Sequence, residues 1–351
     1  MGRRETVKAA VLYGPEQLML EDLPVPQARE GEIVIKVKSC AICGSDVRIY
    51  HHGHANIRLP QVIGHEIAGV VADVGRGVTE FRAGDRVAVA PAIPCGTCYY
   101  CRRGQQTVCD NLESIGYHYG GGFAEYCRIP RRAVMQGNVH IIPDRVDYDD
   151  AAVAEPLACV INGQEIAHIG LGDVVTVIGA GPVGCMHVQL ARNLGALKTI
   201  LVEMNPERLE MAHVAGADLY VDSSREDAIE AVMGATAGHG ADVVIVSCPS
   251  GAAQQQAIRM ARKRGRVSFF GGLPKDRSVI EFDSNLVHYR ELFVLGAYGS
   301  TPRQNEIALR MIAAGGIDLK RIITHRIGLE EIERGMDLIE NGKALKVCVS
   351  Q

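Results

Sequence analysis

Four cysteines lie within one short stretch of the chain: Cys95, Cys98, Cys101 and Cys109. Four thiolates complete the tetrahedral shell of a Zn²⁺ ion and leave no position for a substrate. The spacing therefore predicts a structural zinc site that cross-links a lobe with little apolar sequence of its own. A ferredoxin-like iron–sulfur cluster is the rival interpretation, and independent buried thiols are the other. The chain holds 11 cysteines, and an odd total argues against a disulfide framework.

A second set of candidate metal ligands is spread over three motifs: Cys43-Gly-Ser45-Asp46, Gly64-His65-Glu66 and Glu155-Pro156-Leu157. One thiolate, one imidazole and one carboxylate are the protein ligands that catalytic zinc uses, with water or substrate completing the shell. Spacing alone does not show that these side chains meet. His65 as a loop histidine and Glu155 as a carboxylate at a helix N-terminus therefore stay open. A redox pair of Cys40 with Cys43 is disfavoured because no βαβ unit surrounds it.

A glycine motif of the form G-x-G-x-x-G occupies residues 179–184, as Gly179-Ala-Gly181-Pro182-Val183-Gly184. It follows a predicted strand, Val174–Ile178, and opens a predicted helix, which is the context that dinucleotide binding requires. The first glycine permits a tight turn, the second lets backbone approach a pyrophosphate, and the third lets helix pack on strand. The motif therefore predicts a dinucleotide site at the helix N-terminus. A tight turn without any nucleotide is the alternative.

Glu203 ends the next predicted strand, 19 residues after Gly184. A carboxylate at this position accepts hydrogen bonds from the ribose 2′-hydroxyl and repels a 2′-phosphate, which favours NAD over NADP. Arg208 follows five residues later and keeps NADP open.

The elements that must position these residues fall into three stretches. Residues 1–155, with the cysteine lobe at about 90–112, are rich in Val and Ile with frequent Gly and Pro, which predicts a β-rich domain. Residues 156–292 alternate predicted strands with helices, which indicates βαβ units, a parallel sheet and an α/β fold. The last pair of elements there is a predicted helix over Gly251–Gly265 and a predicted strand over Arg266–Gly272. Residues 293–351 hold one strand, two helices and a closing strand.

Composition excludes several classes of function. The net charge is −4, so the chain offers no basic face for nucleic acid. No apolar run approaches the roughly 18 residues of a membrane helix. The first residues carry no apolar core of a signal peptide, and we expect a cytoplasmic protein.

Taken together, these motifs resemble the zinc-containing medium-chain dehydrogenases of the alcohol dehydrogenase superfamily, over nearly the whole chain. The resemblance is carried by Cys43–Asp46, Gly64–Glu66, the four-cysteine lobe, Gly121-Gly122-Phe123-Ala124-Glu125-Tyr126, Glu155–Leu157 and Gly179–Gly184. The sequence Glu-Pro-Leu, where other alcohol dehydrogenases carry a cysteine, is similar to the polyol (sorbitol) and threonine dehydrogenase branch.

The resemblance implies a GroES-like catalytic domain that the C-terminal segment 293–351 completes, a Rossmann domain with a doubly wound parallel sheet, and a homodimer or homotetramer. It implies two Zn²⁺ ions per subunit. The catalytic ion would be held by Cys43, His65 and Glu155, with Glu66 as a further ligand or as partner of the water in the shell. By analogy, Gly272 and Leu273 in the turn after Gly271, and the segment 297–299, should lie near the nicotinamide.

Two positions depart from the pattern of this family. Ser45 matches the hydroxyl that begins the family's proton relay, but Arg48 stands where the family often has histidine, and a guanidinium cannot accept a proton. The proton must leave through Glu66, ordered water, or a histidine such as His51 or His52, although these histidines, with His54, could equally form a solvated loop. Gly299 stands where sorbitol dehydrogenases carry an arginine that contacts polyol hydroxyls, which argues against sorbitol itself.

We therefore expect a zinc- and NAD-dependent enzyme that oxidises a secondary alcohol of a polyol, a sugar-alcohol phosphate or a cyclitol to the ketone. Hydride passes to the nicotinamide, and Ser45 takes the hydroxyl proton. L-threonine 3-dehydrogenase is the first alternative. A non-catalytic nucleotide-binding structural protein and a zinc-free quinone reductase are disfavoured because relatives of those kinds usually lack the zinc ligands.

Overall fold

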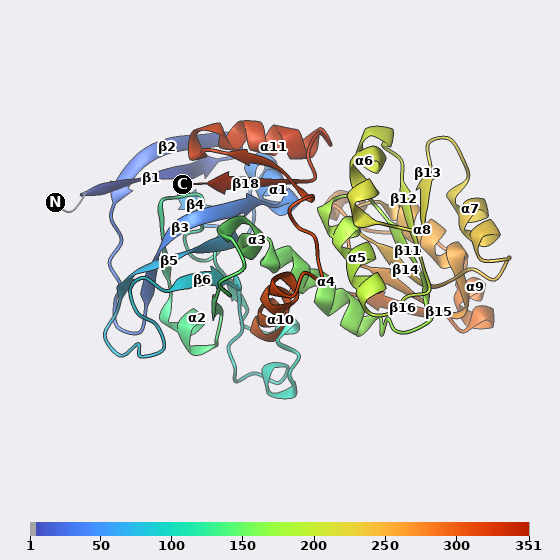
Figure 1. The fold of residues 1–351 in the computed structure, drawn as a ribbon, viewed down its shortest axis with the longest axis horizontal. Helices are drawn as coiled ribbons and strands as arrows, with labels where there is room; N and C mark the ends of the chain where they lie inside the picture. The colour runs from blue at the N-terminus through green and yellow to red at the C-terminus, as the bar shows by residue number, and fades with distance from the viewer. Residues whose placement is uncertain (1–4, 351) are drawn as a thin grey trace. The chain divides into compact units, whose positions relative to one another are not determined.

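The structure is a computed structural model that describes residues 5–350. The chain forms two compact units. In Figure 1, strands β1–β10, β17 and β18 belong to one unit and strands β11–β16 to the other. Unit 1 comprises Met1–Ala158, Gly299–Gly315 and Leu319–Gln351, and unit 2 comprises Cys159–Tyr298 and Gly316–Asp318. Unit 1 is β-rich and unit 2 is a parallel α/β domain.

The main sheet of unit 1 has the strand order β10-β6-β5-β3-β18-β17, and β9 also pairs with β3. Its strands are β3 (Ile33–Ile42), β5 (Glu66–Val74), β6 (Arg86–Val89), β9 (Tyr126–Ile129), β10 (Val139–Ile141), β17 (Ile323–Ile327) and β18 (Lys346–Ser350). The smaller sheets contain β1 (Thr6–Gly14), β2 (Gln17–Pro24) and β4 (Gln61–Val62), and β7 (Ala92–Ile93) with β8 (Glu113–Ser114). Apart from the parallel pair β17–β18, these strands pair antiparallel.

Strand β3 lies inside this sheet, between β5 and β18, and its apolar residues are buried whereas Lys36 is exposed. Its β-branched residues are favoured in a pleated strand, and Ile33, Ile35 and Val37 are fully buried. They pack in one core with Phe123 and with Val347 of the last strand. Strand β18 pairs antiparallel with β3, so Val347 lies opposite Ile42, and the end of the chain completes the sheet that its beginning started.

The helices of unit 1 are α1 (Gly44–His52), α2 (Arg131–Met135), α3 (Tyr148–Ala152), α10 (Pro302–Ala313) and α11 (Ile332–Glu340), and α4 (Ala154–Ile166) begins there and continues into unit 2. Helix α10 starts at a capping box, in which Thr301 and Gln304 satisfy each other's backbone N–H groups. Helix α11 buries Ile332 and Met336 in the core of unit 1.

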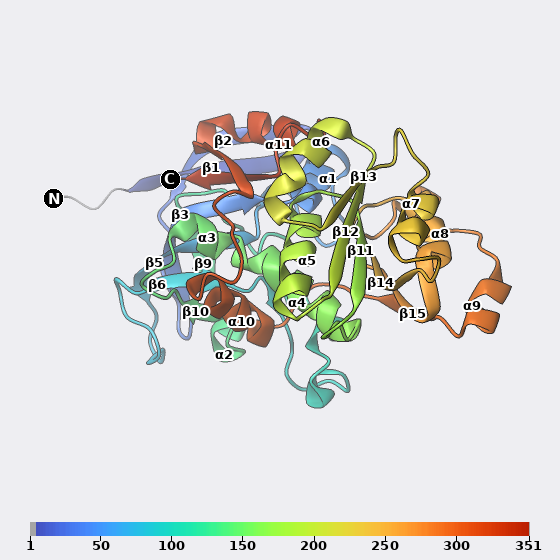
Figure 2. The same ribbon diagram turned by 45° about the vertical axis from the view of Figure 1, so that its right-hand side comes forward.

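Unit 2 is built on a six-stranded parallel sheet of order β13-β12-β11-β14-β15-β16. Its strands are β11 (Val174–Ile178), β12 (Lys198–Glu203), β13 (Leu219–Asp222), β14 (Ala241–Val246), β15 (Ala261–Phe269) and β16 (Phe293–Gly296), and its helices are α5 (Pro182–Asn193), α6 (Pro206–Met211), α7 (Ala228–Ala235), α8 (Gly251–Met260) and α9 (Ser284–Arg290). In Figures 1 and 2, α5 and α6 cover one face of the sheet and α7, α8 and α9 the other. This confirms the doubly wound parallel sheet.

One predicted element of unit 2 was wrong. The helix predicted over Gly251–Gly265 ends at Met260, and Ala261 already pairs with Ala241 of β14. Ala, Arg and Lys are good helix formers, and because they follow Met260 the helical pattern in the sequence continues beyond the true end of the helix. The parallel ladder overrides that propensity, and Arg264 takes a left-handed backbone conformation (φ 59°) where the register of the ladder shifts.

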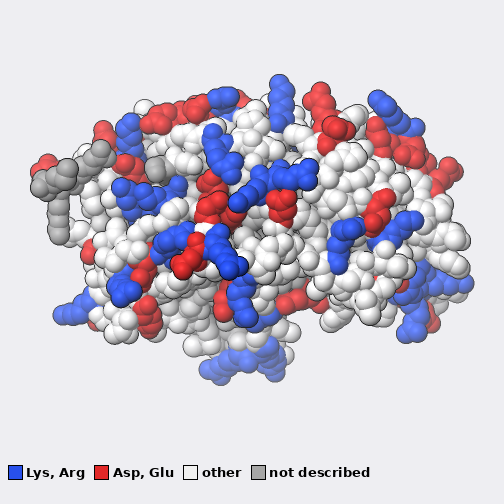
Figure 3. All heavy atoms as spheres, viewed as in Figure 1, with Lys and Arg blue, Asp and Glu red and all other residues white. Residues whose placement is uncertain are grey.

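Charges of both signs intermix on the face of the molecule shown in Figure 3, as the small net charge leads one to expect. Among residues 5–350, no helix has the length and apolar character needed to cross a membrane.

Asp150 is a buried acid that the fold leaves poorly compensated. It is 6% exposed, and within residues 5–350 its Oδ1 has no hydrogen-bond partner. Its neighbour Asp149 pairs instead with Arg326 at 2.6 Å. Burial, and then the charge of Asp147, raise the pKa of Asp150 to about 6 from its usual 3.8. An ionised Asp150 therefore destabilises the native state.

We expect Asp150→Asn to stabilise the protein by roughly 1–3 kcal/mol at pH 7.5, where the wild-type group is ionised in both the folded and unfolded states. The pKa of Asp150 is higher in the folded state than in the unfolded state. The stability gained by Asp150→Asn is therefore complete above pH 6 and shrinks as the pH falls toward 4. Urea unfolding at pH 7.5 and pH 5 measures both values. Asp149→Asn, the matched control, should instead lower stability because it breaks the Arg326 pair. A loss of stability in Asp150→Asn at pH 7.5 would contradict this account.

Candidate metal centres and cofactor site

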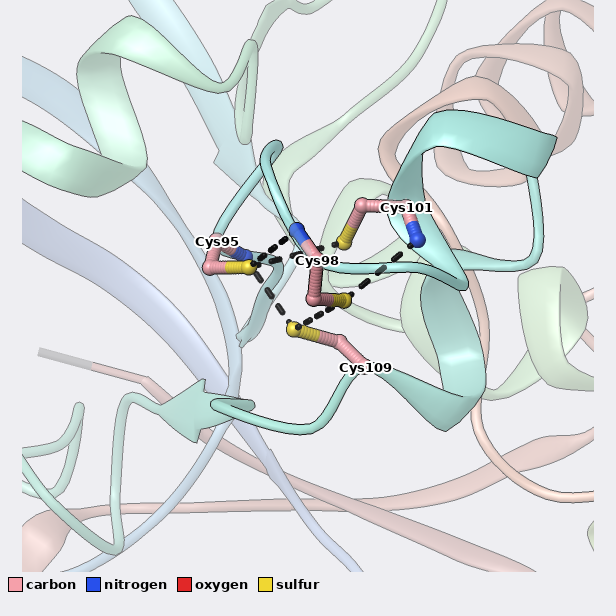
Figure 4. Close-up of side chains that lie close together, drawn as sticks. All are labelled: Cys95, Cys98, Cys101 and Cys109. Carbon is pink, nitrogen blue, oxygen red and sulfur yellow. Dashed lines mark hydrogen bonds between the residues drawn. The ribbon is translucent and has the colours of Figure 1, made fainter.

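The four lobe cysteines converge in the structure. Cys95 and Cys98 come from the loop after β7, Cys101 begins the 3₁₀ turn η1 (Cys101–Arg103), and Cys109 directly follows the 3₁₀ turn η2 (Gln106–Val108). Figure 4 shows their sulfur atoms pointing toward one another, and all four lie within 4.8 Å of each other. Cys95 Sγ is 3.9 Å from Cys101 Sγ, and Cys98 Sγ is 3.9 Å from Cys109 Sγ. These distances are far too long for disulfides, but they match the edges, about 3.8 Å, of a tetrahedron with Zn–S bonds of about 2.3 Å.

Backbone N–H groups point at the same sulfur atoms. Cys98 N donates to Cys95 Sγ at 3.3 Å, and Asn111 N donates to Cys109 Sγ at 3.4 Å. Backbone hydrogen bonds from Thr97 and Cys98 lower the pKa of Cys95 to about 5, which favours its thiolate, the form that binds metal. Burial instead raises the pKa of Cys101 and of Cys109, so these two thiols would ionise on binding a metal. Because Tyr99 and Val108 are more than half exposed, the lobe has little core to stabilise it without a metal.

The second set of ligands is assembled by the register of two neighbouring strands. Strand β3 ends at Ile42, directly before Cys43, and β5 begins at Glu66, directly after His65. The strands pair antiparallel with Ala41 opposite Glu66, which brings the end of one beside the start of the other. Ligand atoms of Cys43, His65 and Glu66 consequently lie within 4.8 Å of one another.

Asp46 orients two of these groups, a role that the sequence interpretation did not assign to it. It is fully buried near the start of α1. Its Oδ2 accepts from the backbone N–H of Cys43 at 2.9 Å, and its Oδ1 lies 3.1 Å from His65 Nδ1. A carboxylate on Nδ1 leaves Nε2 of the imidazole free to bind a metal, and such outer partners typically fix ligand orientation. The donor set thus fits a zinc ion.

Lys346, which was not identified from the sequence, contacts Glu66 of this group. Its ammonium donates to Glu66 Oε1 at 2.7 Å, to Glu66 Oε2 at 2.9 Å and to the Ile42 carbonyl at 3.2 Å. The side chains of Lys346 and Glu66 are 3% and 0% exposed. Burial raises the pKa of Glu66 to about 7 against the opposing charge of Lys346. The only signal in the sequence was a lysine in an otherwise apolar closing strand.

Glu155 and Ser45 lie around this group. Glu155, in the first turn of α4, is near enough for its charge to raise the pKa of Glu66, but it falls outside the 4.8 Å group of ligand atoms. Its role as a zinc ligand stays a prediction. The side chain of Ser45 lies close enough to the Tyr117 hydroxyl to affect its pKa, and the Tyr117 ring lies 5.8 Å from that of His65. Tyr117 was not identified from the sequence.

The predicted proton acceptors around Arg48 lie in different settings. Arg48 is exposed on α1. His51 Nδ1 lies 2.8 Å from Glu16 Oε1 and its Nε2 lies 3.1 Å from Glu340 Oε2, so both ring nitrogens already have partners. His54 packs edge-on against Tyr117, with ring centroids 5.1 Å apart. His51 is therefore poorly placed to receive a proton from Ser45, whereas His54 adjoins the Tyr117 ring, whose hydroxyl lies near Ser45.

The glycine motif of unit 2 has the expected backbone geometry. Gly179 takes a positive φ of 104°, and a Cβ at Gly184 would lie 1.9 Å from the Gly179 carbonyl oxygen. Gly181 caps α5, Pro182 and Val183 follow in its first turn, and nothing lies within 4 Å of a Cβ placed on Gly181. The turn is therefore closed on the helix side and open where a pyrophosphate would approach.

Glu203 lies against this glycine turn. Its Oε2 accepts from Ala180 N at 2.9 Å, and its Oε1 accepts from Met204 N and Asn205 N at 2.9 and 3.0 Å. A carboxylate accepts about four hydrogen bonds, so one position is left for a ribose hydroxyl. Arg208 is partly buried on α6, and its charge lowers the pKa of Cys248, which follows β14, whereas the charge of Glu203 raises it. Gly272 and Leu273 follow β15, and their proximity to a nicotinamide stays a prediction.

Two family models match the chain. The alcohol dehydrogenase GroES-like domain matches residues 29–144, and the zinc-binding dehydrogenase domain matches residues 182–314. The chain is 33% identical to L-threonine 3-dehydrogenase of Rhizobium johnstonii over 98% of each sequence. It is 30% identical to D-arabitol-phosphate dehydrogenase of Enterococcus avium, over 96% of this chain and 94% of that one. A solved structure from Sinorhizobium meliloti with NADP bound shares 33% identity and a TM-score of 0.91, covering 99% of this chain and 100% of that one.

The two metal centres should respond differently to loss of one thiol. Cys98→Ser should remove about one zinc per chain and lower the melting temperature by at least about 5 °C, because the lobe has little core of its own. Cys43→Ser should also remove about one zinc, yet change the melting temperature by less than about 2 °C, since the core of unit 1 surrounds that site. Elemental analysis with calorimetry measures both. Equal stability of Cys98→Ser and wild type would show that the lobe does not depend on a metal.

Proposed function

The chain belongs to the zinc-dependent alcohol dehydrogenase family, and from this we propose that it oxidises a secondary alcohol of a polyol, a sugar-alcohol phosphate or a cyclitol to the ketone, with NAD as hydride acceptor. The observation that carries the proposal is the buried grouping of Cys43, His65 and Glu66, with Asp46 orienting the first two. A nucleotide-binding protein without catalysis would have no need for such a group.

The proposed metal ligands are Cys43, His65 and Glu155, with Glu66 beside them. A bound Zn²⁺ supplies Lewis-acid chemistry that lowers the pKa of a substrate hydroxyl. Asp46 holds the imidazole in the tautomer that leaves Nε2 free. Ser45 Oγ accepts the proton of the substrate hydroxyl while its own proton passes on toward the cofactor ribose or solvent, and the Tyr117 hydroxyl lies near this route.

The cofactor is proposed to bind with its pyrophosphate on the N-terminus of α5, where the backbone at Gly181 is open. Glu203 would accept a hydrogen bond from a ribose hydroxyl with its remaining lone pair, and its charge would oppose a 2′-phosphate. NAD is therefore proposed in preference to NADP, although the similar structure from Sinorhizobium meliloti holds NADP.

L-threonine 3-dehydrogenase is the second candidate. It is favoured by the Rhizobium johnstonii relative, while the Enterococcus avium relative favours a sugar-alcohol phosphate. Both substrates present a secondary hydroxyl to the same metal group. The two substrates differ in what the pocket must bind. L-threonine presents an ammonium and a carboxylate, whereas a sugar-alcohol phosphate presents several hydroxyls and a phosphate.

Turnover against a panel of sugar alcohols, their phosphates, cyclitols and L-threonine tests the proposal. We expect NAD⁺ reduction with one polyol class, lost on removal of zinc with a chelator and regained on its return, because the substrate hydroxyl needs the metal. Cys43→Ser should be inactive with every substrate. Turnover of L-threonine alone would establish the second candidate. Equal rates in the zinc-depleted and zinc-loaded enzyme would overturn the metal-dependent mechanism.

The cofactor preference can be measured separately by fluorescence titration. We expect NADH to bind at least about 10-fold more tightly than NADPH, because the Glu203 carboxylate opposes the added phosphate. Glu203→Gln should narrow that ratio, whereas Glu207→Gln, at an exposed acid in the following helix, should leave it unchanged. Tighter binding of NADPH by the wild type would refute the preference for NAD and point to Arg208 as a phosphate partner.

A further inference from the structure

The buried ammonium of Lys346 has the geometry of a dedicated clamp on Glu66. An ammonium has three N–H donors, and those of Lys346 go to the two carboxylate oxygens of Glu66 and to the Ile42 carbonyl. Its side chain is 3% exposed, so water does not compete for these donors. Burying a lysine is costly unless it is paired, so this arrangement is held in place by its partners.

The clamp acts on both strand ends that carry the proposed ligands. Ile42 directly precedes Cys43, and Glu66 directly follows His65. Lys346 itself opens β18, whose next residue, Val347, lies opposite Ile42 in the sheet. One side chain from the end of the chain therefore fixes the two places where the metal group is assembled.

Glu66 is itself a candidate ligand. One of its carboxylate oxygens lies within 4.8 Å of the ligand atoms of Cys43 and His65, so it could reach a metal held by those two groups. Each oxygen of Glu66 already accepts one strong, charge-assisted hydrogen bond from Lys346. Coordination of a metal by Glu66 would therefore have to compete with the two hydrogen bonds from Lys346.

We propose that Lys346 is a positioning residue that withholds Glu66 from the metal and so keeps one position of the shell free for the substrate hydroxyl. The inference rests on the proposed function, since it presupposes a metal held by Cys43 and His65. Loss of the ammonium leaves a fully buried carboxylate with no cation other than the metal. The Glu66 carboxylate then coordinates the metal and occupies the position that the substrate hydroxyl would take.

Cobalt substitution tests this without reference to turnover. With the lobe still holding zinc, Co²⁺ at the second site reports its ligands through visible absorption, and chelator extraction reports how tightly the ion is held. In Lys346→Met we expect an altered cobalt spectrum and extraction slowed by at least about 5-fold, because a fourth protein ligand has been added. Lys346→Arg should resemble the wild type, since a guanidinium can bind both carboxylate oxygens.

Three further variants make the comparison decisive. Lys346→Met with Glu66→Gln should regain the wild-type cobalt spectrum, because an amide replaces the ligating carboxylate. Lys343→Met, at an exposed lysine of the same segment, is the matched control and should change nothing. If Lys346→Met does not fold, Lys346→Gln, which keeps two donors for Glu66, should give a spectral change in the same direction but smaller.

An unchanged spectrum, or faster loss of cobalt, in folded Lys346→Met or Lys346→Gln would overturn the role of Lys346. A spectral change that persists in the double variant would also overturn it, because Glu66 could not be its cause. Failure of the proposed function gives a different result: the wild type would then show no cobalt absorption that Cys43→Ser abolishes, whatever happens at Lys346.

Discussion

The buried ion pair between Lys346 and Glu66 joins the last strand of the chain to the two strand ends that carry Cys43 and His65. Removing one partner from such a pair typically costs about 3–5 kcal/mol, because the other charge is left buried and uncompensated. The pairing of β18 with β3 therefore does more than close a sheet. It delivers a buried ammonium to the buried Glu66, while the other buried acid, Asp46, pairs with His65.

The two metal centres of unit 1 are built on different principles. In the lobe, four thiolates come from one loop and are supported by backbone N–H groups, so the site is closed and local. At the second site, Cys43 and His65 lie at the ends of separate strands, Asp46 holds both of them, and Lys346 holds the neighbouring Glu66. The first arrangement suits a stabilising cross-link, and the second suits an ion that must keep a position for substrate.

Features that depend on a few neighbouring residues could be predicted from the sequence. The spacing of the lobe cysteines indicated a closed metal site because all four ligands come from a single loop. The glycine motif indicated its turn because only glycine fits at Gly184, where a Cβ would clash with the Gly179 carbonyl. The alternation of strands and helices indicated the parallel sheet, and family resemblance supplied the fold of unit 1. After Met260 the helix propensity of the residues and the pairing of strands β14 and β15 disagree, and there the local pattern predicted helix where the structure has a strand.

What only the tertiary structure decided is which distant side chains meet. No local pattern shows that Ala41 lies opposite Glu66, that Lys346 reaches Glu66 across 280 residues of sequence, or that Tyr117 lies near Ser45. Strand register and the order of strands in a sheet are set by packing over the whole core. The sequence by itself therefore determined the kinds of chemistry available, namely zinc ligation and dinucleotide binding. The folded chain decided that Cys43, His65 and Glu66 form one group and that a lysine from the last strand restrains it, because those contacts exist only once β3, β5 and β18 are paired.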